Sequence, residues 1–221
     1  MSNNTSVTRS KKQEKITNSA SDQQGEIRFY RSNQKPYGVF SNLYRCEFVF
    51  EGRTYPTAEH AYQAGKARTD TVREWILSAP SPALVSMAAH GLYTWDVVPN
   101  WAQVKYDRMR RVLRAKFEQH GDLMALLMST GEDQLVEAAT VDSPINRLWG
   151  EVNGRGKNML GVMLMELRAE FRQTLESARA LASDDIRTAN CCNTVAKTDS
   201  VSSDSLYVVL KFRCISESLP K

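Results

Sequence analysis

The sequence predicts an α+β domain that is mostly helical, has a few short strands and is flanked by disordered tails. The first observation is helical periodicity: the expected last helix, at 158–175, repeats large apolar residues at spacings of four, three, four and four. These residues are Leu160, Leu164, Leu167, Phe171 and Leu175. The second observation is that runs of β-forming residues are few and short, as at 46–50.

The periodic segments occupy residues 26–177 of the 221, a length that suits one domain. Residues 1–25 consist largely of Ser, Thr, Asn, Gln and Lys. Such a segment cannot bury enough apolar surface to offset its ordering entropy, so we expect a disordered tail. Residues 178–221 are expected to form a polar tail in which 206–212 is one candidate strand.

Each element of the domain has its own local signal. Strands are expected at 27–30, 46–50 and 134–140, and helices at 57–68, 81–91, 100–119, 122–129 and 158–175. Thr57 is a suitable N-cap for the first helix, and Pro82 suits the first position of the second, which Gly91 ends.

Composition excludes several classes of protein. Hydrophobic residues make up 42% of the chain and charged residues 24%, and no run approaches the ~18 apolar residues of a membrane span. The beginning of the chain lacks the apolar core of a secretory signal. Four cysteines without a Cys-x-x-Cys pair and three histidines without ligand spacing argue against a disulfide scaffold and a metal site. We therefore expect a cytoplasmic or other intracellular protein without metal or cofactor, no membrane partner, and a monomer.

Charge gives little support for nonspecific nucleic-acid binding, which depends on basic residues that neutralise phosphates. The net charge is +4, but residues 26–177 carry only +1. A local basic patch on the expected helix 100–119 is the exception, and it consists of Arg108, Arg110, Arg111 and Arg114. A solvated helix face explains the same residues, and we favour that interpretation.

Three polar residues share one face of the first expected helix. Glu59, Gln63 and Lys66 are separated by four and then three positions. One interpretation is a surface salt-bridge face. The other is a carboxylate and an amine that point together into a pocket, where burial would lower the pKa of Lys66 and make it nucleophilic.

A second candidate segment is 37–44, in which a small polar pair, Ser41 and Asn42, lies among aromatic residues. This pattern suits a loop that stacks on a planar ring while it hydrogen-bonds the ring edge. The alternative is an ordinary turn with aromatic core anchors. A third segment, the glycine-rich 154–158 before the last helix, is a weak candidate for an anion site.

Together these motifs closely resemble the NADAR family, also called YbiA-like, and the resemblance extends from Phe29 to Arg168. The residues that carry it include Phe40-Ser41-Asn42, Tyr55-Pro56-Thr57, Glu59-His60, Tyr62-Gln63, Lys66, Trp101, Val136-Glu137, Trp149-Gly150, Asn158 and Leu160-Gly161. The resemblance implies a single YbiA-like domain and a hydrolase of N-glycosidic bonds.

The resemblance implies two classes of small ribosyl substrate. One is phosphoribosylamino-pyrimidine intermediates of riboflavin biosynthesis. The other is ADP-ribose attached to guanine, which would make modified nucleic acid a partner. In both, the bond that breaks joins ribose C1 to a nitrogen.

The family match also implies roles for individual residues. Glu59, Lys66 and Asn146 are the expected catalytic residues. The expected substrate-binding residues are Phe40, Ser41, Asn42, Gln63, Trp101, Trp149, Gly150, Asn158 and Gly161. In this assignment Phe40 and Trp149 stack on the heterocycle, Asn42 reads its edge, and Asn158 and Gly161 hold phosphate.

Asn146 departs from the family pattern, which has Asp at this position, three residues before Trp149. Asn has the shape of Asp but neither carries a charge nor accepts a proton. An alternative function therefore stays open: a catalytically weak module that binds ADP-ribose or an NAD-like ligand. Turnover distinguishes the two, since a binding module shows affinity without product.

Overall fold

A computed structural model describes the backbone of residues 25–191 and the side chains of residues 25–181. Its helices are η1 (Tyr37–Phe40), α1 (Ala58–Ala64), α2 (Asp70–Leu77), α3 (Pro82–His90), η2 (Thr94–Asp96), α4 (Trp101–Gln119), α5 (Gly121–Ser129), α6 (Pro144–Trp149) and α7 (Met159–Cys191). Its strands are β1 (Glu26–Phe29), β2 (Phe48–Phe50), β3 (Arg53–Tyr55), β4 (Gln134–Glu137), β5 (Glu151–Val152) and β6 (Arg155–Gly156). The predicted class, mostly helical with short strands, is confirmed.

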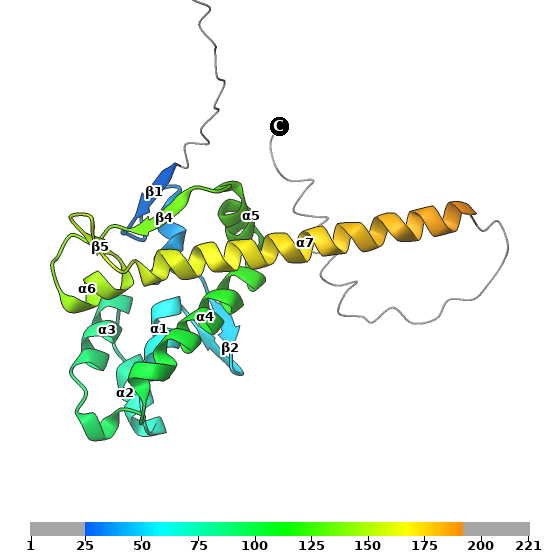
Figure 1. Cartoon of the computed structure of the whole chain (residues 1–221). Helices are drawn as coiled ribbons and strands as arrows, with labels where there is room; N and C mark the ends of the chain where they lie inside the picture. Colours follow the sequence, from blue (N-terminus) through cyan, green and yellow to red (C-terminus); the bar gives the residue numbers. More distant parts are fainter. Residues whose placement is uncertain (1–24, 192–221) are drawn as a thin grey trace, which may run out of the picture.

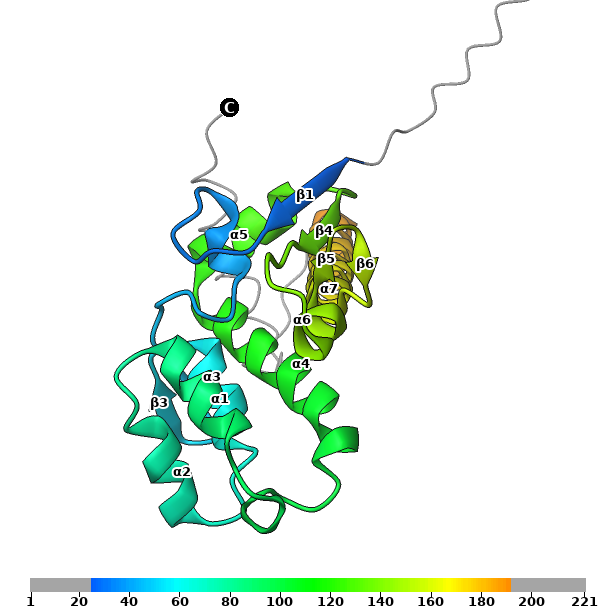
Figure 2. The same cartoon turned by 90° about the vertical axis from the view of Figure 1, so that its left-hand side faces the viewer.

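The strands pair in twos rather than in one large sheet. β1 and β4 are parallel, with Phe29 opposite Glu137, whereas β2–β3 and β5–β6 are antiparallel. Figure 1 shows β1 and β4 beside the first part of α7, which crosses the domain and extends beyond it. Figure 2 shows α1, α2 and α3 gathered at one end of the domain, away from β1 and β4. α4 passes between these two groups of elements.

The main hydrophobic core lies where α4, α5 and α7 pack on β1 and β4. Its members include Phe29, Phe40, Leu113, Phe117, Leu127, Leu135, Leu160 and Leu164. The spacing that predicted α7 arises here, because Leu160, Leu164, Leu167 and Phe171 are all buried on its inner face. α7 thereby holds β4 in place from one side.

A second core joins α1 to the β2–β3 hairpin. Ala58, Ala61 and Ala64 of α1 pack on the buried rings of Phe48 and Tyr55. The alanines are small enough to let the helix lie close to the hairpin, and this fixes the position of α1.

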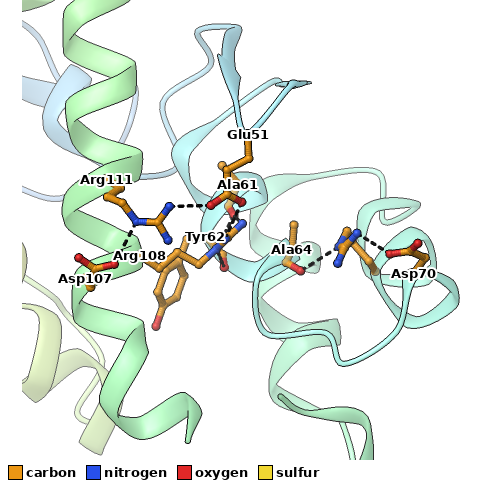
Figure 3. A network of polar contacts seen from close by, with 9 residues as sticks. Glu51, Ala61, Tyr62, Ala64, Asp70, Asp107, Arg108 and Arg111 are labelled. Atoms are coloured by element: carbon orange, nitrogen blue, oxygen red, sulfur yellow. Dashed lines mark hydrogen bonds and ion pairs between the residues drawn. The ribbon is translucent and has the colours of Figure 1, made fainter. Parts of the chain in front are cut away.

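Arg108 of α4 ties α4 to the end of α1 (Figure 3). Its guanidinium group donates hydrogen bonds to the carbonyl oxygens of Ala61 and Tyr62 and pairs with Glu51 at 3.0 Å. A Cβ atom on Gly65 would lie 1.8 Å from Arg108 Nε, so this close approach requires glycine. The alanines of α1 and the following Gly65 thus leave room for the hairpin and the arginine.

The arginines of α4 are held by carboxylates. Arg108 and Arg111 pair with Glu51, Arg111 also with Asp107, Arg110 with Glu166, and Arg114 with Glu118 and Glu170. Since each arginine faces an acidic partner, the geometry favours the solvated helix face over a basic patch for nucleic acid.

The structure contains elements that the sequence did not predict, among them η1, η2 and β3. α2 and α6 are helices that the periodicity did not reveal, and β5–β6 is a short hairpin between α6 and α7. The last helix, expected to end at residue 175, continues to Cys191, and the following residues include four Ala and contain no Gly or Pro. Of the expected tail 1–25, residues 1–24 lie outside the described residues, as does the candidate strand 206–212. The Gly25 N–H donates a hydrogen bond of 3.0 Å to Asp133 Oδ1, so this residue contacts the domain. Within the described part, no helix is long and apolar enough to cross a membrane.

Candidate active site

A cavity of about 470 Å³ lies among α1, α3, α4, α6, the end of β4 and the loop that follows η1. This size is in the range of small-molecule sites. Eight of the twelve residues expected in the site line it: Ser41, Asn42, Glu59, Gln63, Lys66, Trp101, Asn146 and Trp149. The interpretation of Glu59, Gln63 and Lys66 as one pocket-facing set is therefore favoured over a surface salt-bridge face.

α1 presents Glu59 from its first turn. Thr57 caps the helix, because its side-chain oxygen accepts a hydrogen bond of 3.3 Å from the His60 backbone N–H. The buried Glu59 Oε1 accepts a hydrogen bond of 2.8 Å from Gln63 Nε2, and Ser86 of α3 also donates to the carboxylate. Burial raises the pKa of Glu59, while these hydrogen bonds and the nearby His90 oppose that rise. The result is a desolvated carboxylate that the protein partly stabilises.

Lys66 follows α1 and reaches toward the end of α3. Its Nζ donates a hydrogen bond of 2.5 Å to the carbonyl oxygen of Ala89. Partial burial lowers the pKa of Lys66, because the charged form loses hydration there. The side chain lines the same cavity as Glu59. An amine with a lowered pKa is a better nucleophile at neutral pH than an exposed lysine.

The loop after η1 presents Asn42. Its Nδ2 lies 3.5 Å from the Met109 sulfur, and its Oδ1 is buried with no protein hydrogen-bond partner among the described residues. A buried acceptor without a partner is costly, unless a ligand supplies the donor. The fully buried Lys116 of α4 holds this loop by donating to the carbonyl oxygens of Val39 at 2.6 Å and Ser41 at 3.2 Å.

Aromatic residues form one wall of the cavity. The Tyr62 ring lies 5.2 Å from the Trp101 ring and 5.5 Å from the Trp149 ring, measured between ring centres. Trp149 also contacts Tyr106 at 6.0 Å. Rings held in this way offer a rigid apolar surface for a planar ligand.

Glu137 also lines the cavity, and the sequence reasoning assigned it no role. It is the last residue of β4 and directly follows the buried Leu135 and Val136 in the chain. Burial, and secondarily the charge of Glu59, raises the pKa of Glu137 to about 7. The available signal was a carboxylate directly after a short apolar run, within a segment that matches the family.

Phe40 does not line the cavity. Its ring is fully buried, packs edge-on against Phe29 at 5.6 Å and stacks on Tyr37 at 5.7 Å. This position contradicts the expected stacking of Phe40 on a ligand and agrees with the alternative of an aromatic core anchor.

Asn158, Gly161 and Gly150 also lie outside the cavity lining, and they support β4 instead. Asn158 donates from Nδ2 to Leu135 O at 2.8 Å and accepts from Glu137 N–H at 3.0 Å. A Cβ atom on Gly161 would lie 2.0 Å from Leu135 O, and one on Gly150 would lie 2.2 Å from Glu137 O. Because the amide of Asn158 is already engaged with β4, its expected contact with phosphate is not supported.

Comparisons with known proteins agree on one family. The model of the NADAR domain matches residues 28–172. The N-glycosidase YbiA of Escherichia coli is 41% identical over 146 residues, which cover 66% of this chain and 88% of that protein. An N-glycosidase of Nostoc punctiforme is 35% identical over 154 residues, which cover 67% of this chain and 94% of that protein. A riboflavin biosynthesis protein of Vibrio vulnificus is 30% identical over 148 residues, which cover 66% of this chain and 39% of that protein.

The NMR structure of Escherichia coli YbiA has the same fold. Its TM-score is 0.60 at 38% identity, and the similarity covers 68% of this chain and 86% of that one. With a family model that spans most of the described domain and relatives that match in sequence and structure, this chain belongs to the NADAR family.

Proposed function

We propose that this protein hydrolyses the N-glycosidic bond between a ribose C1 and a heterocycle or amine nitrogen, in the cavity between α1, α3 and α6. The observation that carries the proposal is a buried carboxylate, Glu59, in one cavity with the amine of Lys66 and the aromatic wall. The similarity to N-glycosidases supports the same activity.

The residues suit the charge that this reaction develops. As the bond breaks, positive charge builds on C1 and the ring oxygen of the ribose. A carboxylate beside that position, Glu59, stabilises the charge and orients the attacking water. Its effect is large because the carboxylate is buried, and charges interact more strongly there than in bulk water.

The leaving group is a planar nitrogen compound, and two features of the cavity suit such a group. Trp101 and Trp149 border it with apolar ring surface. The unpartnered Asn42 Oδ1 is an acceptor for an N–H or amino group on the edge of the heterocycle. Aminopyrimidines and guanine both carry such a donor.

Lys66 has two chemical uses in such a site. As an ammonium group it hydrogen-bonds the leaving group or a phosphate. As a neutral amine it attacks the aldehyde of an opened ribose and forms a Schiff base. Treatment with borohydride during turnover separates these uses, since only a Schiff base is trapped as a stable adduct that adds the mass of the reduced ribosyl group.

We favour a phosphoribosylamino-pyrimidine over ADP-ribosyl guanine in nucleic acid as the substrate. The cavity volume suits a compact ligand. The arginines that nucleic-acid phosphates would contact on α4 are already paired with carboxylates. The names of some relatives point in the same direction, since they are riboflavin biosynthesis proteins.

The test is a product assay with the full chain and both substrate classes. We expect free pyrimidine and ribose 5-phosphate from the first, and loss of this activity in Glu59→Gln. Glu74→Gln is the matched control, because Glu74 lies on α2 and pairs with the exposed Arg53. Release of ADP-ribose from the second substrate alone would replace the preferred class. Binding of both substrates without product would establish the alternative, a ligand-binding module.

A further inference from the structure

We propose that Glu137 is the general acid of the reaction in this cavity, and that it works as a pair with Glu59. The carboxyl group of Glu137 gives its proton to the departing nitrogen while Glu59 stays ionised. This assignment rests on the proposed function, and it adds a residue to which the sequence analysis gave no role.

Three elements fix the backbone of Glu137. In the parallel ladder it lies opposite Phe29 of β1, and the Ala138 N–H donates to Phe29 O at 2.8 Å. Asn158, at the start of α7, accepts the Glu137 N–H at 3.0 Å. After α6, Gly150 packs so closely on the Glu137 carbonyl that a Cβ atom there would clash. A side chain mounted on such a rigid support keeps its position during a reaction.

The two carboxylates in the cavity have different surroundings. Glu59 accepts hydrogen bonds from Gln63 and Ser86, which stabilise its ionised form. For Glu137, no side-chain donor or ion pair reaches its carboxylate among the described residues. Two like charges in one cavity repel each other, so the first proton binds where ionisation is least supported. That position is Glu137.

The other titratable groups of the cavity do not change which of the two carboxylates binds a proton first. They are Tyr30 and Arg31 after β1, Tyr62 and Lys66 of the α1 region, His90 of α3 and Lys105 of α4. Burial raises the pKa of Glu137 to about 7 with Glu59 as the second cause, and none of these cations offsets that rise. At neutral pH a substantial fraction of Glu137 therefore carries a proton, as a general acid must.

The proposed steps balance. The electron pair of the C1–N bond moves to nitrogen, which takes the proton from Glu137 and departs as a neutral amine. A water oxygen then bonds to C1, and its proton passes to the Glu59 carboxylate. Transfer of one proton from Glu59 to Glu137 restores the starting state, and the net reaction consumes one water molecule.

The test compares two leaving groups in the full chain and in Glu137→Gln. The first substrate is a phosphoribosylamino-pyrimidine, whose amine leaves poorly without a proton. The second is nitrophenyl riboside 5-phosphate, whose nitrophenolate leaves without one. We expect kcat for the first to fall by ~10²-fold or more and kcat for the second to fall by less than ~10-fold. The matched control is Glu151→Gln, because Glu151 of β5 is half-buried, lies outside the cavity lining and pairs with Arg28 at 3.7 Å.

The pH profile is the second measurement. In the unaltered protein kcat for the amine substrate should fall above about pH 7, and in Glu137→Gln that alkaline limb should disappear. A Glu137→Gln variant as active as the parent on the amine substrate, or equally impaired on both substrates, would overturn the role of Glu137 alone. Absence of product from the unaltered protein with either substrate would overturn the proposed function itself.

Discussion

The buried ammonium group of Lys116 donates a hydrogen bond of 3.2 Å to the carbonyl oxygen of Ser41, directly beside the cavity. A second bond, of 2.6 Å, reaches Val39 O. The cation is fully buried, and burial lowers its pKa to about 8. In return for this desolvation, the two hydrogen bonds of Lys116 fix the loop that carries Asn42. The loop also contacts α1, because the Glu59 N–H donates a hydrogen bond of 3.0 Å to Asn42 O.

Replacement of Lys116 by Met should therefore affect stability and substrate binding together. Met fills a similar volume but leaves two carbonyl oxygens without their donor, so we expect a loss of about 1–3 kcal/mol in the free energy of unfolding. Because the loop loosens while Glu59 stays on α1, KM should rise several-fold and kcat should change less. Urea denaturation and steady-state kinetics measure the two effects. The exposed Lys157→Met is the control, and equal KM values in both variants would contradict the positioning role of Lys116.

Replacement of Asn42, unlike that of Lys116, should weaken substrate binding without lowering stability. Its Oδ1 is a buried acceptor without a protein partner, so Asn42→Leu removes a polar atom that costs free energy in the unliganded protein. We expect the free energy of unfolding to stay within about 1 kcal/mol of the parent or to rise. KM should rise by ~10-fold or more, because a ligand donor then faces an apolar group. A strong loss of stability with unchanged KM would show that Asn42 is structural.

The elements predicted from sequence are those with local signals. Thr57, Ser81 and Pro82 mark helix starts by chemistry that acts within one turn, and α1 and α3 begin where these residues indicate. α2 and α6 also have side-chain caps, at Thr69 and Ser143. They were missed because they bury few residues, Ile76 in α2 and none in α6, so no buried apolar stripe marks them in the sequence.

Local spacing predicted that Glu59 and Gln63 face the same side, and the structure places both in the cavity lining, whereas the placement of Glu137 and Phe40 depends on tertiary contacts. Glu59 and Gln63 share one face of α1, which their spacing predicts, and Lys66 follows shortly after the helix ends. The position of Glu137 follows from the pairing of β1 with β4 and from the amide of Asn158, partners 108 and 21 residues away in the chain. Phe40 lies in an aromatic-rich loop, and the sequence pattern does not distinguish a ring that faces a ligand from one that faces the core.

The raised pKa of Glu137 predicts a pH dependence of stability. A carboxyl group whose folded-state pKa of about 7 exceeds its ordinary value of 4.5 stabilises the folded state below pH 4.5, and this contribution is lost as pH rises through 7. Between these limits the free energy of unfolding should fall by up to about 3 kcal/mol from this group. Denaturation of the parent and of Glu137→Gln at pH 5 and pH 8 measures it. The variant should show a smaller fall, and parallel curves would contradict the assignment of this pKa.

Asn146→Asp is expected to raise turnover at a small cost in stability. Asn146 lines the cavity at the position where the family pattern has Asp, and Asp adds a charge that favours a positively charged transition state. A positioned carboxylate contributes ~10²–10⁴-fold, so a gain of ~10-fold or more in the single-turnover rate is the expected outcome. The cost arises because Asn146 Nδ2 donates to Val141 O at 2.7 Å, a bond that Asp does not make. Since water reaches this partly exposed position, the loss should be about 1 kcal/mol.

Single-turnover rates of the parent, Asn146→Asp and Lys66→Ala show whether Asn146 or Lys66 contributes more to catalysis. A faster Asn146→Asp identifies Asn146 as the residue that limits catalysis. If its rate equals that of the parent while Lys66→Ala is inactive, Asn146 only positions the ribose and Lys66 is the main catalytic group. The melting temperature of Asn146→Asp must be measured alongside. If it falls by more than a loss of about 1 kcal/mol explains, the new carboxylate repels Val141 O and turns away from the cavity.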